Sequence, residues 1–188
     1  MKAIKILFFI LMGIITLVLL SAAFAPDNVT ITTNITIDAK PEQVYNNVVS
    51  LKSWKHWSPF EHDSTMTDTF SGPESGVGST REWKGNAIGE GKMTVLEATE
   101  YTHIKNNLDF GTKGGAIGTW TFNPIDSTKT HVTWSTHITG LKFPFERLMG
   151  LILEPMMKPM FDDGLKDLKE YTETGKVDKT KKKKSKHE

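Results

Sequence analysis

The chain has 188 residues, of which 38% are hydrophobic and 24% charged, and its formal net charge is +1. It contains no cysteine, which excludes a disulfide framework and thiolate chemistry. No basic face with interleaved aromatic residues is predicted in the folded region, so no nucleic acid is expected among its partners.

An uncharged apolar stretch occupies residues 6–25 and is preceded by Lys2 and Lys5. About twenty such residues span a bilayer as a helix, so the stretch is predicted to anchor the chain in a membrane. Ala25 also ends a pattern typical of a signal-peptide cleavage site, although Pro26 after it suits a protease poorly. The lysines place the N-terminus in the cytoplasm and the rest outside it, as a single-pass protein or, after cleavage near Ala25, a secreted or periplasmic one.

The composition divides the chain into three parts. Residues 1–26 form the anchor or signal segment, residues 27–174 have the size of one domain, and residues 175–188 form a lysine-rich tail. Such a like-charge block is predicted to be disordered. It is interpreted either as a solubilising terminus or as a segment attracted to an anionic surface of the cell envelope.

Alternation of apolar and polar residues predicts a half-buried strand at residues 29–37. A short amphipathic helix is expected to begin at Pro41, because proline is favoured in a helix's first turn. A second short helical segment contains Trp54 and Trp57 at three-residue spacing and should end at Ser58, since the next residue is proline.

The next part of the chain alternates strand patterns with glycine, asparagine and proline turn signals, which indicates antiparallel sheet without crossover helices. The six predicted strands are residues 66–70, 79–84, 90–98, 103–110, 117–122 and 131–138.

Helical spacing returns at residues 145–171, where Pro155 and Pro159 should kink or restart the helix because each removes a backbone donor. One strand, two short helices, six strands and a long final helix predict an α+β domain in which the helix covers one face of a curved sheet.

A helix laid across a bent sheet tends to enclose an apolar cavity with a few polar groups, so binding of a hydrophobic small molecule is the leading hypothesis. The alternative interpretation of the same aromatic and methionine pattern is an ordinary packed core. The predicted wall residues are Trp83, Trp120, Phe122, Trp134, Met156, Met157 and Met160.

Strand alternation puts Arg81 and Trp83 on one face and Glu82 on the other, so only one of the two charges points inward. An inward Glu82 would be a buried acid and a weak catalytic candidate, as would Asp109. An inward Arg81 would instead bind the carboxylate of a ligand. The sequence leaves these alternatives open.

A metal site is not predicted. His56 and His62, with Glu61 and Asp63 beside them, have a spacing that fits no common metal site and lie in a predicted loop. No cofactor motif is found either, because the glycines around residues 85–92 lack the spacing of a phosphate-binding loop.

The order of elements and several motifs resemble the START-related superfamily, also called SRPBCC or birch-pollen-allergen-like, in its bacterial polyketide cyclase/dehydrase and lipid transport branch. Membrane-anchored bacterial members have a similar layout. The motifs are Ile37-Asp-Ala-Lys-Pro-Glu-Gln-Val-Tyr, Leu51-Lys-Ser-Trp-Lys-His-Trp-Ser-Pro-Phe, Ser71-Gly-Pro-Glu-Ser-Gly-Val-Gly-Ser, Trp83-Lys-Gly-Asn, Gly89-Glu-Gly-Lys-Met-Thr and Thr133-Trp-Ser.

The resemblance implies a helix-grip fold, with a seven-stranded antiparallel sheet around the final helix and a cavity for hydrophobic ligands. It does not imply an enzyme, because fold alone does not choose a function. Three hypotheses follow: carriage or sensing of a hydrophobic or amphipathic small molecule or lipid at the cell envelope; a cyclase or hydrolase; and an envelope protein-interaction module with a closed core.

Overall fold

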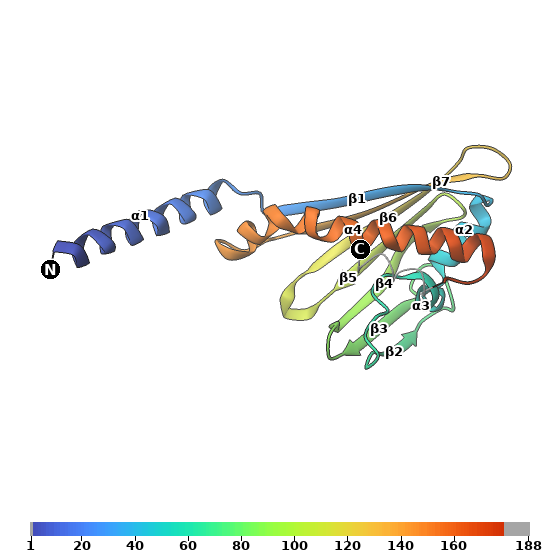
Figure 1. Cartoon of the computed structure of the whole chain (residues 1–188). Coiled ribbons are helices and arrows are strands. Elements are labelled where there is room, and N and C mark those ends of the chain that lie inside the picture. Colours follow the sequence, from blue (N-terminus) through green and yellow to red (C-terminus); the bar gives the residue numbers. More distant parts are fainter. Residues whose placement is uncertain (1, 179–188) are drawn as a thin grey trace.

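The computed structural model describes residues 2–178 and shows a seven-stranded antiparallel sheet with a long helix across one face (Figure 1). The strand order is β1-β7-β6-β5-β4-β3-β2, so the strands from β2 to β7 are neighbours in sequence order and β1 pairs with the last strand. The lysine-rich run that begins at residue 179 lies outside the described residues. The strands are β1 (Asn28–Ile37), β2 (Thr67–Ser71), β3 (Thr80–Gly85), β4 (Gly89–Thr99), β5 (His103–Asp109), β6 (Gly115–Pro124) and β7 (Thr130–Thr139).

The described helices also follow the predicted order. The predicted α+β helix-grip class is confirmed, and the predicted strand boundaries differ from the observed ones by at most two residues. The helices are α1 (Lys2–Phe24), α2 (Pro41–Val49), α3 (Trp54–Trp57) and α4 (Phe145–Thr174), with the 3-10 turns η1 (Leu51–Ser53) and η2 (Gly111–Lys113).

Helix α1 projects away from the domain at the end of the sheet where β1 begins (Figure 1). Its large apolar side chains are exposed along its length, and among the described helices it is the one long and apolar enough to cross a membrane. A signal sequence has the same properties. At its end, Ala22 and Ala25 are buried, α1 contacts α4, and the Leu141 amide donates a hydrogen bond to the Asp27 carbonyl.

Helix α4 continues through Pro155 and Pro159 as one helix, so of the two predicted outcomes, a kink or a restart, the restart does not occur. Both prolines are exposed, which leaves the backbone carbonyls freed by their missing N–H groups on the outer side of the helix. In the second half of α4, Phe161, Leu165 and Leu168 are buried against the sheet at four- and three-residue spacing.

Pairing in register aligns the inward side chains of the sheet in rows that run across the strands. The first row lies nearest to α1, because β1 begins at that end. It contains Ile138, Ala116, Leu108, Met93 and Arg81; the second row contains Ile31, Thr136, Gly118, Asn106 and Val95; the third contains Thr33, Trp134, Trp120 and Ile104.

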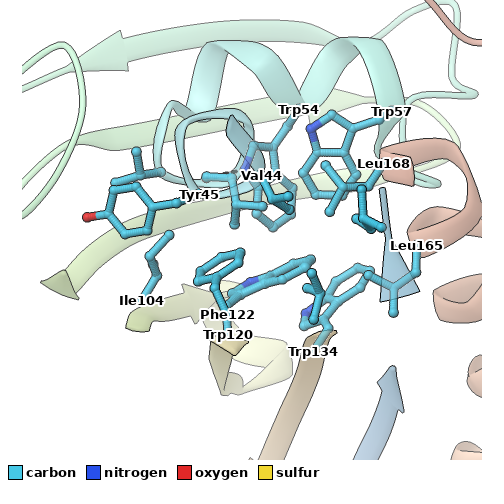
Figure 2. Packing of buried hydrophobic residues seen from close by; sticks show 14 of the residues in the cluster. Val44, Tyr45, Trp54, Trp57, Ile104, Trp120, Phe122, Trp134, Leu165 and Leu168 are labelled. Carbon is cyan, nitrogen blue, oxygen red and sulfur yellow. Dashed lines mark hydrogen bonds between the residues drawn. The ribbon is translucent and has the colours of Figure 1, made fainter. Parts of the chain in front are cut away.

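The half of the domain beyond the third row is filled with large side chains. Trp54 and Trp57 of α3 lie over Trp120 and Phe122 of β6, and Figure 2 shows them together with residues of α2 and α4. The indole of Trp54 makes edge-to-face contact with that of Trp120, with ring centroids 5.8 Å apart. This part of the domain is a solid aromatic core.

Candidate functional site

A cavity of about 230 Å³ lies between α4 and the first two rows of the sheet. Its position follows from side-chain size. Ala116, Gly118 and Thr136 occupy the middle of these rows and have short side chains, whereas Trp120 and Trp134 occupy the third row. The helix therefore rests on Trp134 and leaves the space above the short side chains unfilled.

The third row forms an aromatic boundary between the cavity and the solid core. Trp120 and Trp134 stack with ring centroids 4.5 Å apart, and Trp134 stacks on Phe161 of α4 at 4.1 Å. Trp83 and Phe110 contact each other edge-to-face at 6.0 Å and also line the cavity. The wall is thus mostly apolar and aromatic.

The predicted wall residues fall into two groups. Trp83, Trp120, Trp134 and Met157 line the cavity, and so does Arg81. The prediction was wrong for the other three residues, which do not line the cavity. Phe122 lies in the solid core, and Met156 and Met160 are exposed on the outer side of α4. For the two methionines the reason is the helical period. Met157 and Phe161 lie on the inward face of α4, so Met156 and Met160, each one residue earlier, point outward.

Prediction missed several residues of the wall. They include the small or polar Ala116, Gly118 and Asn106 and large apolar residues such as Phe60 and Phe110. Strand alternation places Ala116 and Gly118 on the face of Trp120, so their inward direction could be predicted. Their role in forming the cavity could not be predicted, because a cavity depends on which short side chains lie opposite one another across strands.

Arg81 points inward and is buried, with its guanidinium bound by two carboxylates. Its Nη1 and Nη2 donate to the two oxygens of Glu61 at 2.7 and 2.9 Å, and its Nε and Nη2 donate to Asp68 at 2.8 and 3.0 Å. Burial alone would lower the pKa of Arg81, but its hydrogen bonds to Glu61 and Asp68 and their charges outweigh burial and raise it. Because both carboxylates already bind this cation, Arg81 is not a free site for a ligand carboxylate.

Glu82 and Asp109 do not line the cavity. The Glu82 carboxylate is half exposed and pairs with Lys92 at 3.1 Å, and the exposed Asp109 accepts a hydrogen bond from the Gly111 amide. Both lie on the outer face by strand alternation. Neither residue is therefore the buried acid beside the cavity that the cyclase or hydrolase hypothesis would need.

The predicted cluster of histidine and acidic residues does not come together: His56 lies in α3, whereas Glu61, His62 and Asp63 lie in the loop before β2. The His56 ring stacks on Tyr171 with centroids 5.0 Å apart, and Glu61 binds Arg81. Asp63 accepts hydrogen bonds from the Thr65 hydroxyl and from the amides of Ile88, Thr65 and Ala87, which hold its pKa well below the ordinary value. Within residues 2–178, no group of three or more His, Cys, Asp or Glu side chains could hold a metal ion.

Two buried polar atoms in the cavity wall have no partner in the described part of the chain: the Asn106 Oδ1 and the Trp120 Nε1. Two other buried indoles do have partners: the Trp54 Nε1 donates to the Val48 carbonyl at 2.8 Å and the Trp57 Nε1 donates to the Asn47 carbonyl at 3.1 Å. Most buried polar atoms in proteins are hydrogen-bonded, so these two exceptions mark a distinct part of the wall.

The first half of α4 has a second notable surface, on its outer side next to α1. Its large apolar side chains are exposed, with Phe145 at 76%. Soluble monomers seldom expose many such side chains together. What we call the apolar face of α4 comprises Phe143, which lies just before the helix, and Phe145, Met149, Leu151, Ile152, Met156 and Met160 within it.

An antiparallel sheet that grips a long C-terminal helix over an internal cavity defines a helix-grip protein. The chain belongs to the family of polyketide cyclase/dehydrase and lipid transport proteins, whose model matches residues 28–173. This confirms the resemblance seen in the sequence motifs. No curated protein sequence matches the chain at a significant level.

Several solved structures with low sequence identity have a similar fold. Norcoclaurine synthase from Thalictrum flavum, in complex with dopamine and hydroxybenzaldehyde, is 14% identical, with a TM-score of 0.60 over 80% of this chain and 90% of that one. The Aha1 dimer from Colwellia psychrerythraea is 21% identical, with a TM-score of 0.57 over 79% and 98%. XoxI from Bacillus cereus is 15% identical, with a TM-score of 0.55 over 78% and 96%.

Proposed function

We propose that this protein binds a hydrophobic or amphipathic small molecule in the cavity between α4 and the sheet, and that it carries or senses this molecule at a membrane of the cell envelope. The observation that carries the proposal is the cavity of about 230 Å³ with its mostly apolar wall. Cavities of that kind favour apolar ligands because water gains few hydrogen bonds in them.

The cavity also limits the size of the ligand. An apolar cavity of about 150 Å³ accommodates benzene, so a volume half as large again suits a molecule, or part of one, with about ten non-hydrogen atoms. A fused pair of aromatic rings or a short branched chain has this size. The norcoclaurine synthase structure, which holds dopamine and hydroxybenzaldehyde, supports the use of this fold for small aromatic ligands.

The binding proposal agrees better with the geometry than the two alternatives do. Catalysis by Glu82 or Asp109 would require a carboxyl group beside the cavity, and both are on the outer face of the sheet. A protein-interaction module with a closed core would lack this cavity. Binding of an apolar ligand uses this mostly apolar space directly.

Two features support a position at a membrane. Helix α1 has the length and apolarity of a membrane span, and the apolar face of α4 lies on the adjoining part of the domain. In this arrangement α1 is an anchor and the outer side of α4 rests on the lipid surface. Lys2 and Lys5 before α1 favour a cytoplasmic N-terminus and place the domain on the opposite side.

A cavity-filling substitution tests the binding site. Gly118→Val places a side chain in the cavity, and its Cβ makes only ordinary contacts, 3.4 Å from the Leu108 Cδ1 and 3.8 Å from the Asn106 Cβ. The probe is 2-naphthol, which has eleven non-hydrogen atoms, and its binding to the full chain in amphipol is measured by calorimetry. We expect saturable binding with one site in the unmodified chain, and at least about tenfold weaker binding in Gly118→Val, because the valine occupies ligand space.

Thr119→Val is the matched control. Thr119 precedes Trp120 on β6 and points away from the cavity, so this variant places the same valine side chain outside the site and should bind 2-naphthol as the unmodified chain does. Equal affinity in Gly118→Val and Thr119→Val, or no saturable binding to the unmodified chain, would contradict the proposed site.

A further inference from the structure

Asn106 introduces an amide into a wall that is otherwise mostly apolar. It lies on β5 in the second row, directly opposite Gly118 of β6, and its side chain is only 1% exposed. Its Oδ1 accepts no hydrogen bond from any described residue. An amide buried in this way is destabilising unless something pairs with it, so its position needs an explanation beyond packing.

The indole of Trp120 provides the complementary group. Trp120 is two residues beyond Gly118 on the same inward face, and is therefore a diagonal neighbour of Asn106. Its Nε1 is a donor without an acceptor, while the Asn106 Oδ1 is an acceptor without a donor. Gly118, Asn106 and Trp120 all line the cavity, so both groups belong to the same part of its wall.

We propose that Asn106 and Trp120 bind the hydroxyl group of a neutral hydrophobic ligand. A hydroxyl is the smallest group that can donate to the Asn106 Oδ1 and accept from the Trp120 Nε1 at once. The apolar body of the ligand then lies over Ala116 of the first row, below Met157. This inference rests on the proposed function, because it assigns the chemistry of a ligand in the same cavity.

The remaining charges favour a neutral head group. The two charged residues among those that line the cavity are Arg81 and Glu61, and they are hydrogen-bonded to each other. With Asp68 added, the cluster contains two carboxylates and one guanidinium, so it does not attract an anion. A hydroxyl needs no countercharge, and a polar site of this kind rejects analogues that lack the hydroxyl.

A ligand and variant cycle tests this assignment. The affinities of 2-naphthol and 2-methylnaphthalene, which differ in one hydroxyl against one methyl group, are measured with the full chain in amphipol and with Asn106→Leu. We expect the ratio of the two affinities to shift about tenfold toward 2-methylnaphthalene in Asn106→Leu, because leucine keeps the bulk and loses the amide. Comparing ratios cancels the different partition of the two ligands into water and amphipol.

Asn107→Leu is the matched control, since Asn107 is the next residue of β5 and points to the outer face. Its affinity ratio should equal that of the unmodified chain. An unchanged ratio in Asn106→Leu would overturn the assignment while leaving ligand binding intact. Failure of both ligands to bind the unmodified chain would instead contradict the proposed function, and the assignment with it.

A second readout needs no binding-site variant. In the ¹⁵N-labelled full chain, the indole N–H resonance of Trp120 should move downfield with 2-naphthol, as expected for a new hydrogen bond, and should not do so with 2-methylnaphthalene. The indole resonances of Trp54 and Trp57 are internal controls, because both already donate to backbone carbonyls. A Trp120 indole resonance that responds equally to both ligands would overturn the assignment.

Discussion

Arg81 illustrates how one buried residue positions a wall of the cavity. Its guanidinium joins β3 to the loop before β2 through Glu61 and to β2 itself through Asp68. Bidentate arginine–carboxylate pairs have a fixed planar geometry, so they define the position of the loop as well as binding it. Phe60 and Met66 of the same loop also line the cavity.

Replacing Arg81 should therefore destabilise the domain. Arg81→Met leaves the carboxylates of Glu61 and Asp68 close together without their cation, and we expect the free energy of unfolding to fall by about 3 kcal/mol. Urea unfolding of the full chain in amphipol measures this. The triple variant Arg81→Met, Glu61→Gln, Asp68→Asn removes the charges and should recover most of the loss. A single variant as stable as the unmodified chain would show that the cluster does not hold the loop.

At the residue scale, the sequence defined faces but not their direction. Alternation correctly placed Arg81 and Trp83 on one face of the strand and Glu82 on the other. Which of the two faces points to the core could not be predicted without the neighbouring strands. The unpaired Asn106 amide could not be predicted at all, because an asparagine on a strand is usually solvated and its burial depends on α4 and the adjoining strands.

Helix α4 combines two functions along its length. Its second half packs on the sheet, whereas its first half covers the cavity with Met157 and exposes an apolar face on the other side. Prediction found the extent of the helix from its apolar spacing, but could not orient it. Two inward faces were possible, because the helix contains two equally apolar pairs with four-residue spacing. One pair is residues 156 and 160, and the other is residues 157 and 161.

The apolar face of α4 should contact lipid when the chain is in a bilayer. The chain has no cysteine, so the single-cysteine variants Ile152→Cys and Lys166→Cys label cleanly with an environment-sensitive fluorophore. In nanodiscs that contain spin-labelled lipids, we expect strong quenching at position 152, because amphipathic helices lie roughly 5–10 Å deep in the interface. Position 166 is exposed in the second half of α4 and is the control, for which little quenching is expected. Equal weak quenching at both positions would show that this face does not rest on the bilayer.

At the scale of the whole molecule, the cavity and α1 lie at the same end of the domain. The first two rows of the sheet are nearest to α1, while the solid core of aromatic residues lies toward the other end. In the proposed arrangement, the binding cavity is in the membrane-facing half, so a ligand that partitions into lipid has a short path to it.

The overall architecture was predictable because each element had a local pattern, and the order of the elements matched a known family. Alternation, turn residues and helical spacing all gave the same α+β arrangement. For the cavity, the sequence predicted only that a helix across a bent sheet tends to enclose one, and not where it lies. Its location depends on long-range register, which aligns Ala116 with Ile138 and Gly118 with Thr136, and local patterns do not determine this register.

Native mass spectrometry of the full chain, extracted from the membranes of its own host, tests the central claim most directly. The account predicts a copurifying hydrophobic molecule in one-to-one stoichiometry, with a neutral hydroxyl group, that is missing from Gly118→Val and present in Thr119→Val. An unmodified chain that is recovered empty and also fails to bind 2-naphthol would contradict the account, as would a copurifying molecule retained equally by Gly118→Val.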